Sequence, residues 1–175
     1  MSFEASDGYR LSGSFWPSTT ASSAPIVILI HEFKSNRNEY ASFVPQLLLE
    51  GYSVLAYDTR GAGESNNGEY HLRDLPKDVE GALSYVLGRP DISSKNVFLV
   101  GVSVGANQAL MTAGRDERVS AAVILSPSTD GVRGTLWDTV DTTESFRPRN
   151  IFVLTDERER VEAEQLYERI LEPKQ

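Results

Sequence analysis

The sequence predicts an α/β fold: three layers built on a mostly parallel sheet, preceded by an N-terminal antiparallel hairpin. Three observations support this prediction. Strand-like apolar runs alternate with amphipathic helical segments from about residue 25 onward. The run Ile26–Ile30 is apolar without alternation, as in strands that are buried on both faces. The pair Asp7-Gly8 supplies the turn of a hairpin. With 175 residues, we expect a single domain over 1–175.

The first part of the chain predicts the hairpin, one central strand and one helix. Phe3–Ser6 and Arg10–Trp16 flank the Asp-Gly turn as two short strands, and Ile26–Ile30 forms the central strand. Apolar side chains recur at helical spacing over Glu39–Glu50. Gly51 follows this segment, as glycine commonly does at the end of a helix.

The rest of the chain continues the alternation of strand and helix. Predicted strands cover residues 52–57, 97–100, 121–125 and 151–154. Predicted helices cover residues 75–87, 106–114 and 162–171. The polar, glycine-rich stretch 58–67 is typical of a loop.

Composition excludes several classes of function. The net charge of −8 argues against a nucleic-acid or anionic-membrane partner, because both attract positive charge. The absence of cysteine excludes disulfides and thiolate ligands, and two histidines are too few for a histidine-rich site, so we expect neither a metal nor another cofactor. The opening residues MSFEASDGYR do not form a signal peptide and no apolar run could span a bilayer, so we expect a cytoplasmic protein.

The segment Gly101-Val102-Ser103-Val104-Gly105 is a G-x-S-x-G motif between a predicted strand and a predicted helix. This context is the test for a nucleophile elbow. A turn from strand to helix within so few residues forces the central residue into a strained backbone conformation, and the flanking glycines allow neighbouring backbone to come close. We therefore expect Ser103 to be a nucleophile with a positive φ and an accessible hydroxyl.

Two further motifs follow the first two long buried strands: HEF at 31–33 and DTRGAGES at 58–65. Together with the elbow, they resemble the α/β-hydrolase superfamily, in particular its small esterases and dienelactone-hydrolase-like members. These proteins have an H-G-x segment after their third strand and a D-x-R-G-x-G-x-S loop after their fourth. The resemblance covers nearly the whole chain.

The resemblance implies roles for several of these residues. The backbone N–H groups of Phe33 and Val104 would form the oxyanion hole, and His31 would hold its loop in place rather than act as the base. Asp58 and Arg60 would form a mutually bonded turn. Glu32 departs from the family pattern, which has glycine there, and its side chain bears on the assignment of Phe33.

A serine hydrolase also needs an acid that orients its base. The resemblance places this acid after the strand at 151–154, in the loop TDERER at 155–160. The distance from strand to helix favours Glu159, with Asp156 as the alternative. Either residue could instead be a solvated loop charge or a helix cap.

The base of the family is a histidine in a loop after an eighth strand. That strand would begin where the sequence ends, at Gln175. The remaining histidine, His71, precedes the second predicted helix and is expected on the surface. We therefore expect a C-terminally truncated fold that lacks the last strand and the catalytic histidine.

Two functions stay open on this basis. The first is a carboxylesterase-like serine hydrolase that acts on a small ester, thioester or lactone through an acyl-enzyme. The second is an inactive hydrolase-fold relative that binds a partner or ligand. Whether the chain is an enzyme is open, since its base is not identified. Without the eighth strand, residues 151–154 would form a bare sheet edge, which predicts a homodimer through that edge.

Overall fold

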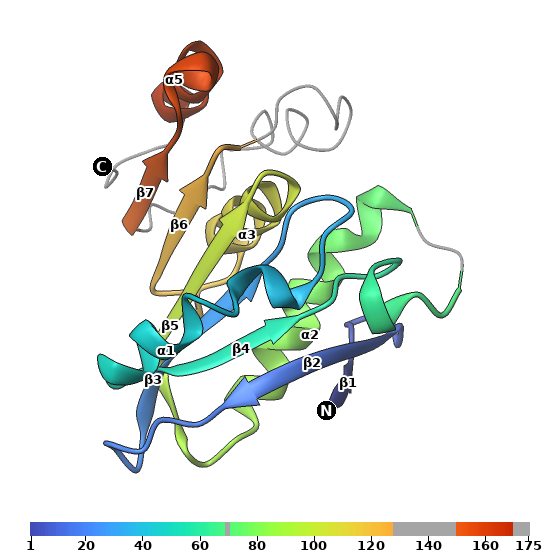
Figure 1. The fold of residues 1–175 in the computed structure, drawn as a ribbon, viewed down its shortest axis with the longest axis vertical. Helices are drawn as coiled ribbons and strands as arrows, with labels where there is room; N and C mark the ends of the chain where they lie inside the picture. The colour runs from blue at the N-terminus through green and yellow to red at the C-terminus, as the bar shows by residue number, and fades with distance from the viewer. Residues whose placement is uncertain (69–70, 128–149, 170–175) are drawn as a thin grey trace.

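The computed structural model describes residues 1–68, 71–127 and 150–169, and these form a twisted sheet with helices on both faces (Figure 1). Within these ranges the strand order is β1-β2-β4-β3-β5-β6-β7. The strand bounds are Ser2–Glu4 (β1), Arg10–Trp16 (β2), Ala24–Ile30 (β3), Ser53–Tyr57 (β4), Ile92–Val102 (β5), Ala121–Leu125 (β6) and Asn150–Leu154 (β7). The α/β class and the antiparallel N-terminal hairpin are thus confirmed.

The sheet is antiparallel only at its N-terminal edge. Strand β1 pairs with β2, and β2 pairs with β4, in antiparallel register. From β4 through β3, β5, β6 and β7 every pairing is parallel. Because β3 has a parallel neighbour on each side and helices above and below, Ile26–Ile30 is almost fully buried, as its continuous apolar sequence predicts.

Alternate residues of the central strands pack into two separate cores. Ile26, Ile28 and Ile30 pack with α2 (Leu75–Leu87) and α3 (Val104–Arg115) on one face of the sheet. Val27 and Leu29 pack on the other face with the 3-10 turn η1 (Arg37–Tyr40) and α1 (Val44–Leu49). The period of two along a strand therefore produces the three layers.

The helix predicted over Glu39–Glu50 is wrong in its first half. The structure has η1 and then α1, separated by residues 41–43. Pro45 explains the break, because its ring excludes the helical carbonyl of Ala41 and it has no N–H to donate. The predicted stop is confirmed: Gly51 has φ +87°, a conformation that glycine adopts without penalty.

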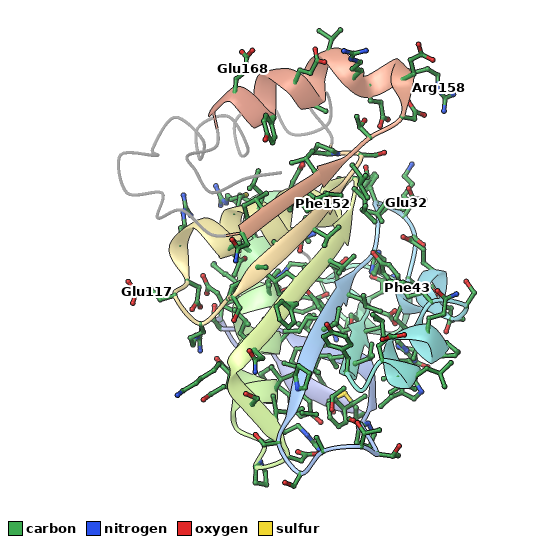
Figure 2. All side chains as sticks on the ribbon, turned by 90° about the vertical axis from the view of Figure 1, so that its left-hand side faces the viewer. Glu32, Phe43, Glu117, Phe152, Arg158 and Glu168 are labelled. Carbon is green, nitrogen blue, oxygen red and sulfur yellow. The ribbon has the colours of Figure 1, made fainter. Side chains whose placement is uncertain are left out.

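Other predicted boundaries shift as well. Strand β5 begins at Ile92 rather than near residue 97, because Ile92 pairs with Ala24 across an irregularity in the register. Helix α3 begins at Val104, directly after the elbow serine. The C-terminal helix α5 covers Arg160–Arg169 and lies beyond the end of β7 (Figure 2), whereas the end predicted for it falls outside the described residues.

No helix in the described ranges is both long and apolar enough to cross a membrane.

Candidate active site

Ser103 lies at the turn between β5, which ends at Val102, and α3, which begins at Val104. Its backbone has φ 53° and ψ −117°, so the predicted positive φ is confirmed. The residue is partly exposed. Such a conformation is sparsely populated by residues with a side chain and costs of order 1–3 kcal/mol. It persists here because both flanking elements are fixed in the sheet and the helical layer.

The two glycines of the motif are required by close backbone contacts. A Cβ atom at Gly101 would lie 2.2 Å from the carbonyl oxygen of Gly105. A Cβ atom at Gly105 would lie 2.2 Å from the carbonyl oxygen of Ile30, in the neighbouring strand β3. Any other residue at either position would push α3 away from the sheet edge. The glycine spacing in the sequence therefore reports a real packing constraint.

Hydrogen bonds continue from the elbow across the carboxyl edge of the sheet. The N–H of Ser103 donates to the carbonyl of Leu125 at 2.9 Å. The N–H of Ser126 donates to the carbonyl of Leu154 at 2.7 Å. The segments that follow β5, β6 and β7 therefore leave the sheet at the same level. Neighbouring strands are about 4.8 Å apart, so the loop after β7 starts about 10 Å from the elbow.

Phe33 and Val104 both line a pocket of about 260 Å³ beside the elbow. Val104 is the first residue of α3, and the first N–H groups of a helix have no partner within it. Within the described ranges, neither the Phe33 nor the Val104 N–H donates a hydrogen bond. The positive end of α3 also favours negative charge at this point. The pocket can therefore offer two amide donors to a developing oxyanion.

His31 is buried, and both of its ring nitrogens are engaged. Nε2 accepts the N–H of Thr59 at 3.0 Å, so the proton of the neutral ring resides on Nδ1. Nδ1 then donates to the carbonyl of Glu32 at 2.7 Å. These bonds tie the loop after β3 to the loop after β4. They agree with the expectation that His31 holds this loop, because neither nitrogen is available to accept a proton from Ser103.

The predicted bond between Asp58 and Arg60 is wrong, although both residues do order their loop. Asp58 accepts the backbone N–H of Arg37 at 2.8 Å and that of Glu64 at 2.9 Å, and it pairs with the Arg37 guanidinium. Neighbouring loop residues thus compete successfully for the Asp58 carboxylate. The side chain of Arg60 is directed to other partners.

Arg60 bridges two carboxylates from distant parts of the chain. It pairs with Asp78 of α2 at 2.7 Å and with Asp7 of the hairpin turn at 2.9 Å. Hydrogen bonding from Arg60 holds the pKa of Asp7 well below its usual range, whereas burial raises the pKa of Asp78 to about 6 although Arg60 opposes that shift. Arg60 also lines the pocket, so this network fixes one wall of it.

The two candidate acids differ in how they are used. The Asp156 carboxylate accepts the N–H groups of Arg158, at 2.8 Å, and Glu159, at 3.2 Å, and so caps the turn η5 (Glu157–Glu159). Hydrogen bonding from Arg158 also lowers the pKa of Asp156. Glu159 is exposed. In the described ranges its carboxylate accepts one hydrogen bond, from the Thr155 hydroxyl at 3.4 Å. Neither carboxylate is in contact with Ser103 in this structure.

The structure also identifies a residue that the sequence analysis missed. Gln108 lies on α3 and lines the same pocket as Phe33 and Val104. It is only 3% exposed. Its position four residues after Val104, on the same face of the predicted helix, was the available signal. His71, in contrast, is exposed and is not among the residues that line the pocket in the described part of the chain.

Comparisons with known proteins give a family match and related sequences. A family model described as "Serine aminopeptidase, S33" matches residues 21–143, more than two thirds of the chain. The quorum-quenching protein AidA of Acinetobacter baumannii is 27% identical over 135 residues, covering 75% of this chain and 44% of the relative. The uncharacterized protein Rv2307c of Mycobacterium tuberculosis is 33% identical over 127 residues, covering 72% and 44%. The chain thus spans less than half the length of these curated relatives.

Solved structures share the fold at low sequence identity. The α/β hydrolase GrgF from Penicillium sp. sh18 superposes with a TM-score of 0.82 at 16% identity, covering 99% of this chain and 86% of that one. The Pyrococcus furiosus esterase Pf2001 gives 0.75 at 22% identity, covering 97% and 76%. Together with the family match, they confirm the α/β-hydrolase resemblance. The chain belongs to the S33 serine aminopeptidase family, within the α/β-hydrolase superfamily.

Proposed function

We propose that this chain is the nucleophile-bearing part of a carboxylesterase-like serine hydrolase that acts on a small ester, thioester or lactone. One observation carries the proposal: Ser103 has a positive φ and directly precedes Val104, which lines a pocket together with Phe33. Strained backbone of this kind is typical of active sites. The esterases among the structural neighbours support the ester class, although at their low identity the likeness extends only to the fold.

In the proposed reaction, the Ser103 oxygen attacks the substrate carbonyl carbon and its proton passes to a base. The resulting oxyanion receives hydrogen bonds from the Phe33 and Val104 N–H groups. The tetrahedral intermediate then expels the alcohol or thiol, which takes up the proton, and leaves an acyl-serine. Water attacks this ester in the same way and releases the acid.

We assign the orienting acid to Glu159 in preference to Asp156. The Asp156 carboxylate already caps η5 and pairs with Arg158, and these bonds would have to break before it could orient a base. Glu159 follows the strand at the same sheet edge and has only the weak contact with Thr155. Either group lies two strands away from Ser103, a gap that an imidazole could bridge.

A second candidate function is an inactive relative that binds a ligand through the same pocket. It is favoured by the state of the two histidines of the sequence. His31 has no free nitrogen, and His71 does not line the pocket in the described part of the chain. Under this alternative the elbow geometry would be retained for its packing alone.

Covalent labelling separates the two functions. The purified protein is incubated with a fluorophosphonate and the adduct is located by peptide mass spectrometry. With imidazole added as the base, we expect a single adduct on Ser103, absent from Ser103→Ala. Ser126→Ala is the matched control, because Ser126 follows the adjacent strand and also has a positive φ of 46°. Labelling that is absent, or that persists in Ser103→Ala, would favour the inactive relative.

A further inference from the structure

Gln108 lies in the wall of the pocket that Phe33 and Val104 also line. Its side-chain oxygen is fully buried and has no hydrogen-bond partner among the residues that the structure describes. Buried polar atoms are almost always paired, so an unpaired one in a native fold indicates that a hydrogen-bond partner is missing. Since Gln108 lines the pocket, a rotation of its carboxamide would bring this oxygen to a molecule bound there, which could supply the partner.

The other buried polar side chains of this wall are already satisfied. His31 and Thr59 bond to each other, and Arg60 is held by Asp7 and Asp78. Among the buried polar side chains that line the pocket in the described ranges, only Gln108 has an atom without a partner. Among these buried side chains, Gln108 is therefore the one that can still bond to a ligand. The buried, apolar Leu75 lines the same pocket.

The position of Gln108 relates it to the reacting carbonyl. Gln108 follows Val104 by four residues on α3, so the two lie on one face of the helix, about 6 Å apart along its axis. Side chains on a helix lean toward its N-terminus, which brings the carboxamide closer to the level of Val104. Gln108 thus lines the pocket one helical turn from Val104, whose N–H would hold a substrate oxygen.

We propose that Gln108 is a specificity-determining residue that binds a hydroxyl group on the acyl chain of the substrate. This inference rests on the proposed function, because it takes the pocket as the acyl site. A hydroxyl both donates and accepts, as a carboxamide does. An unsubstituted alkyl chain would leave the buried oxygen unpaired, and a carboxylate would find the Arg60 guanidinium already occupied by two aspartates.

Binding of unreactive analogues tests the proposal without requiring catalysis. Dissociation constants of butyramide, 3-hydroxybutyramide and 4-hydroxybutyramide are measured by NMR titration, all in a Ser103→Ala background. We expect one hydroxylated amide to bind roughly three- to tenfold more tightly than butyramide, the value of one neutral hydrogen bond. Gln108→Met should abolish this preference while leaving the affinity for butyramide similar.

Thr112→Val is the matched control. Thr112 lies one further turn along α3, and its buried hydroxyl also has no partner in the described part of the chain, but it lines a different cavity. The preference should survive that change. Equal binding of the three amides, no binding of any of them, or a preference that persists in Gln108→Met would each overturn the proposal. Because Ser103 is absent throughout, these outcomes are independent of whether Ser103 is a working nucleophile.

Discussion

The α-carbon of Gly105 faces the carbonyl oxygen of Ile30 so closely that an added Cβ would lie 2.2 Å from it. Both partners are backbone, so neither can move aside as a flexible side chain would. We expect Gly105→Ala to lower the free energy of unfolding by about 3 kcal/mol, at the upper end of the cost of overpacking. Urea denaturation measures this change. Gly68→Ala is the control, because a Cβ there meets nothing within 4 Å; equal stability of the two variants would contradict the packing argument.

Glycine at position 103 should relieve the strain of the elbow. The conformation at φ 53°, ψ −117° costs a residue with a side chain of order 1–3 kcal/mol, and glycine avoids most of that cost. Glycine also loses more conformational entropy on folding, which offsets part of this gain. We therefore expect the free energy of unfolding of Ser103→Gly to exceed that of Ser103→Ala by about 1 kcal/mol. The same denaturation experiment compares the two variants. If Ser103→Ala were the more stable of them, the backbone would not be strained.

Added imidazole should increase turnover if a base is the missing component. Without one, the purified chain should hydrolyse p-nitrophenyl acetate slowly, at most about 10³–10⁴-fold over water. Imidazole in the buffer should raise the rate for the wild type more than for Ser103→Ala, and His71→Ala should behave like the wild type. Rapid hydrolysis without imidazole that both Ser103→Ala and His71→Ala abolish would instead identify His71 as the base.

The buried Asp78 should make stability depend on pH between 5 and 7. Burial raises its pKa to about 6, above the value of about 3.9 in an unfolded chain, so the folded state takes up a proton first as pH falls. Asp78 therefore contributes more stability at pH 5 than at pH 7, by about 1 kcal/mol. The free energy of unfolding measured at both pH values should show this gain in the wild type.

Two variants isolate the source of that pH dependence. Asp78→Asn should lack the gain, whereas Asp7→Asn should keep it, because the pKa of Asp7 is lowered and lies outside this range. Should Asp78→Asn fail to fold, an NMR titration of the Asp78 carboxyl group in the wild type gives its pKa directly. A carboxyl that titrates near 4 would refute the assignment.

The free edge at β7 leads us to expect a homodimer. Within the described ranges, no strand pairs with the outer edge of β7, on which Phe152 lies (Figure 2). Phe152 and Leu154 on this strand are 42% and 47% exposed. Two copies could pair their edges isologously. Sedimentation equilibrium should show the dimer most clearly at high salt, because the charge of −8 opposes association. Phe152→Lys should dissociate it, and Val161→Lys on α5 should not. A monomer at every ionic strength would rule out this interface.

The sequence predicted the layered fold well because its strands carry an unambiguous pattern. Ile26–Ile30 is uniformly apolar, and the elbow glycines stand at two positions where backbone contacts leave no room for a Cβ. The break before α1 was missed, since apolar residues at 40, 43 and 44 keep helical spacing although Pro45 interrupts the hydrogen bonds. Periodicity reports which side chains are buried, and it is insensitive to one lost backbone bond.

The site was predictable only where a motif describes backbone geometry. Ser103 and its glycines follow from local sterics. The pairing of Asp58 with Arg37, and of Arg60 with Asp7 and Asp78, was not predictable, because these partners lie on elements distant in sequence that the fold brings together. Gln108 escaped notice for a related reason: a lone glutamine on a helix is usually a surface residue, and only the packing of α3 shows that it is buried.

The bridge from Arg60 to Asp7 and Asp78 has a consequence for how this family can diverge. Removing one partner of a buried charge cluster is strongly destabilising, whereas exchanging the whole set for apolar residues can be nearly neutral. Positions 60 and 78 are both almost fully buried, so a single substitution at either one leaves the other charge without its partner and is destabilising. Among homologues, we expect these two positions to change together or not at all, with position 7 following more loosely because it is partly exposed.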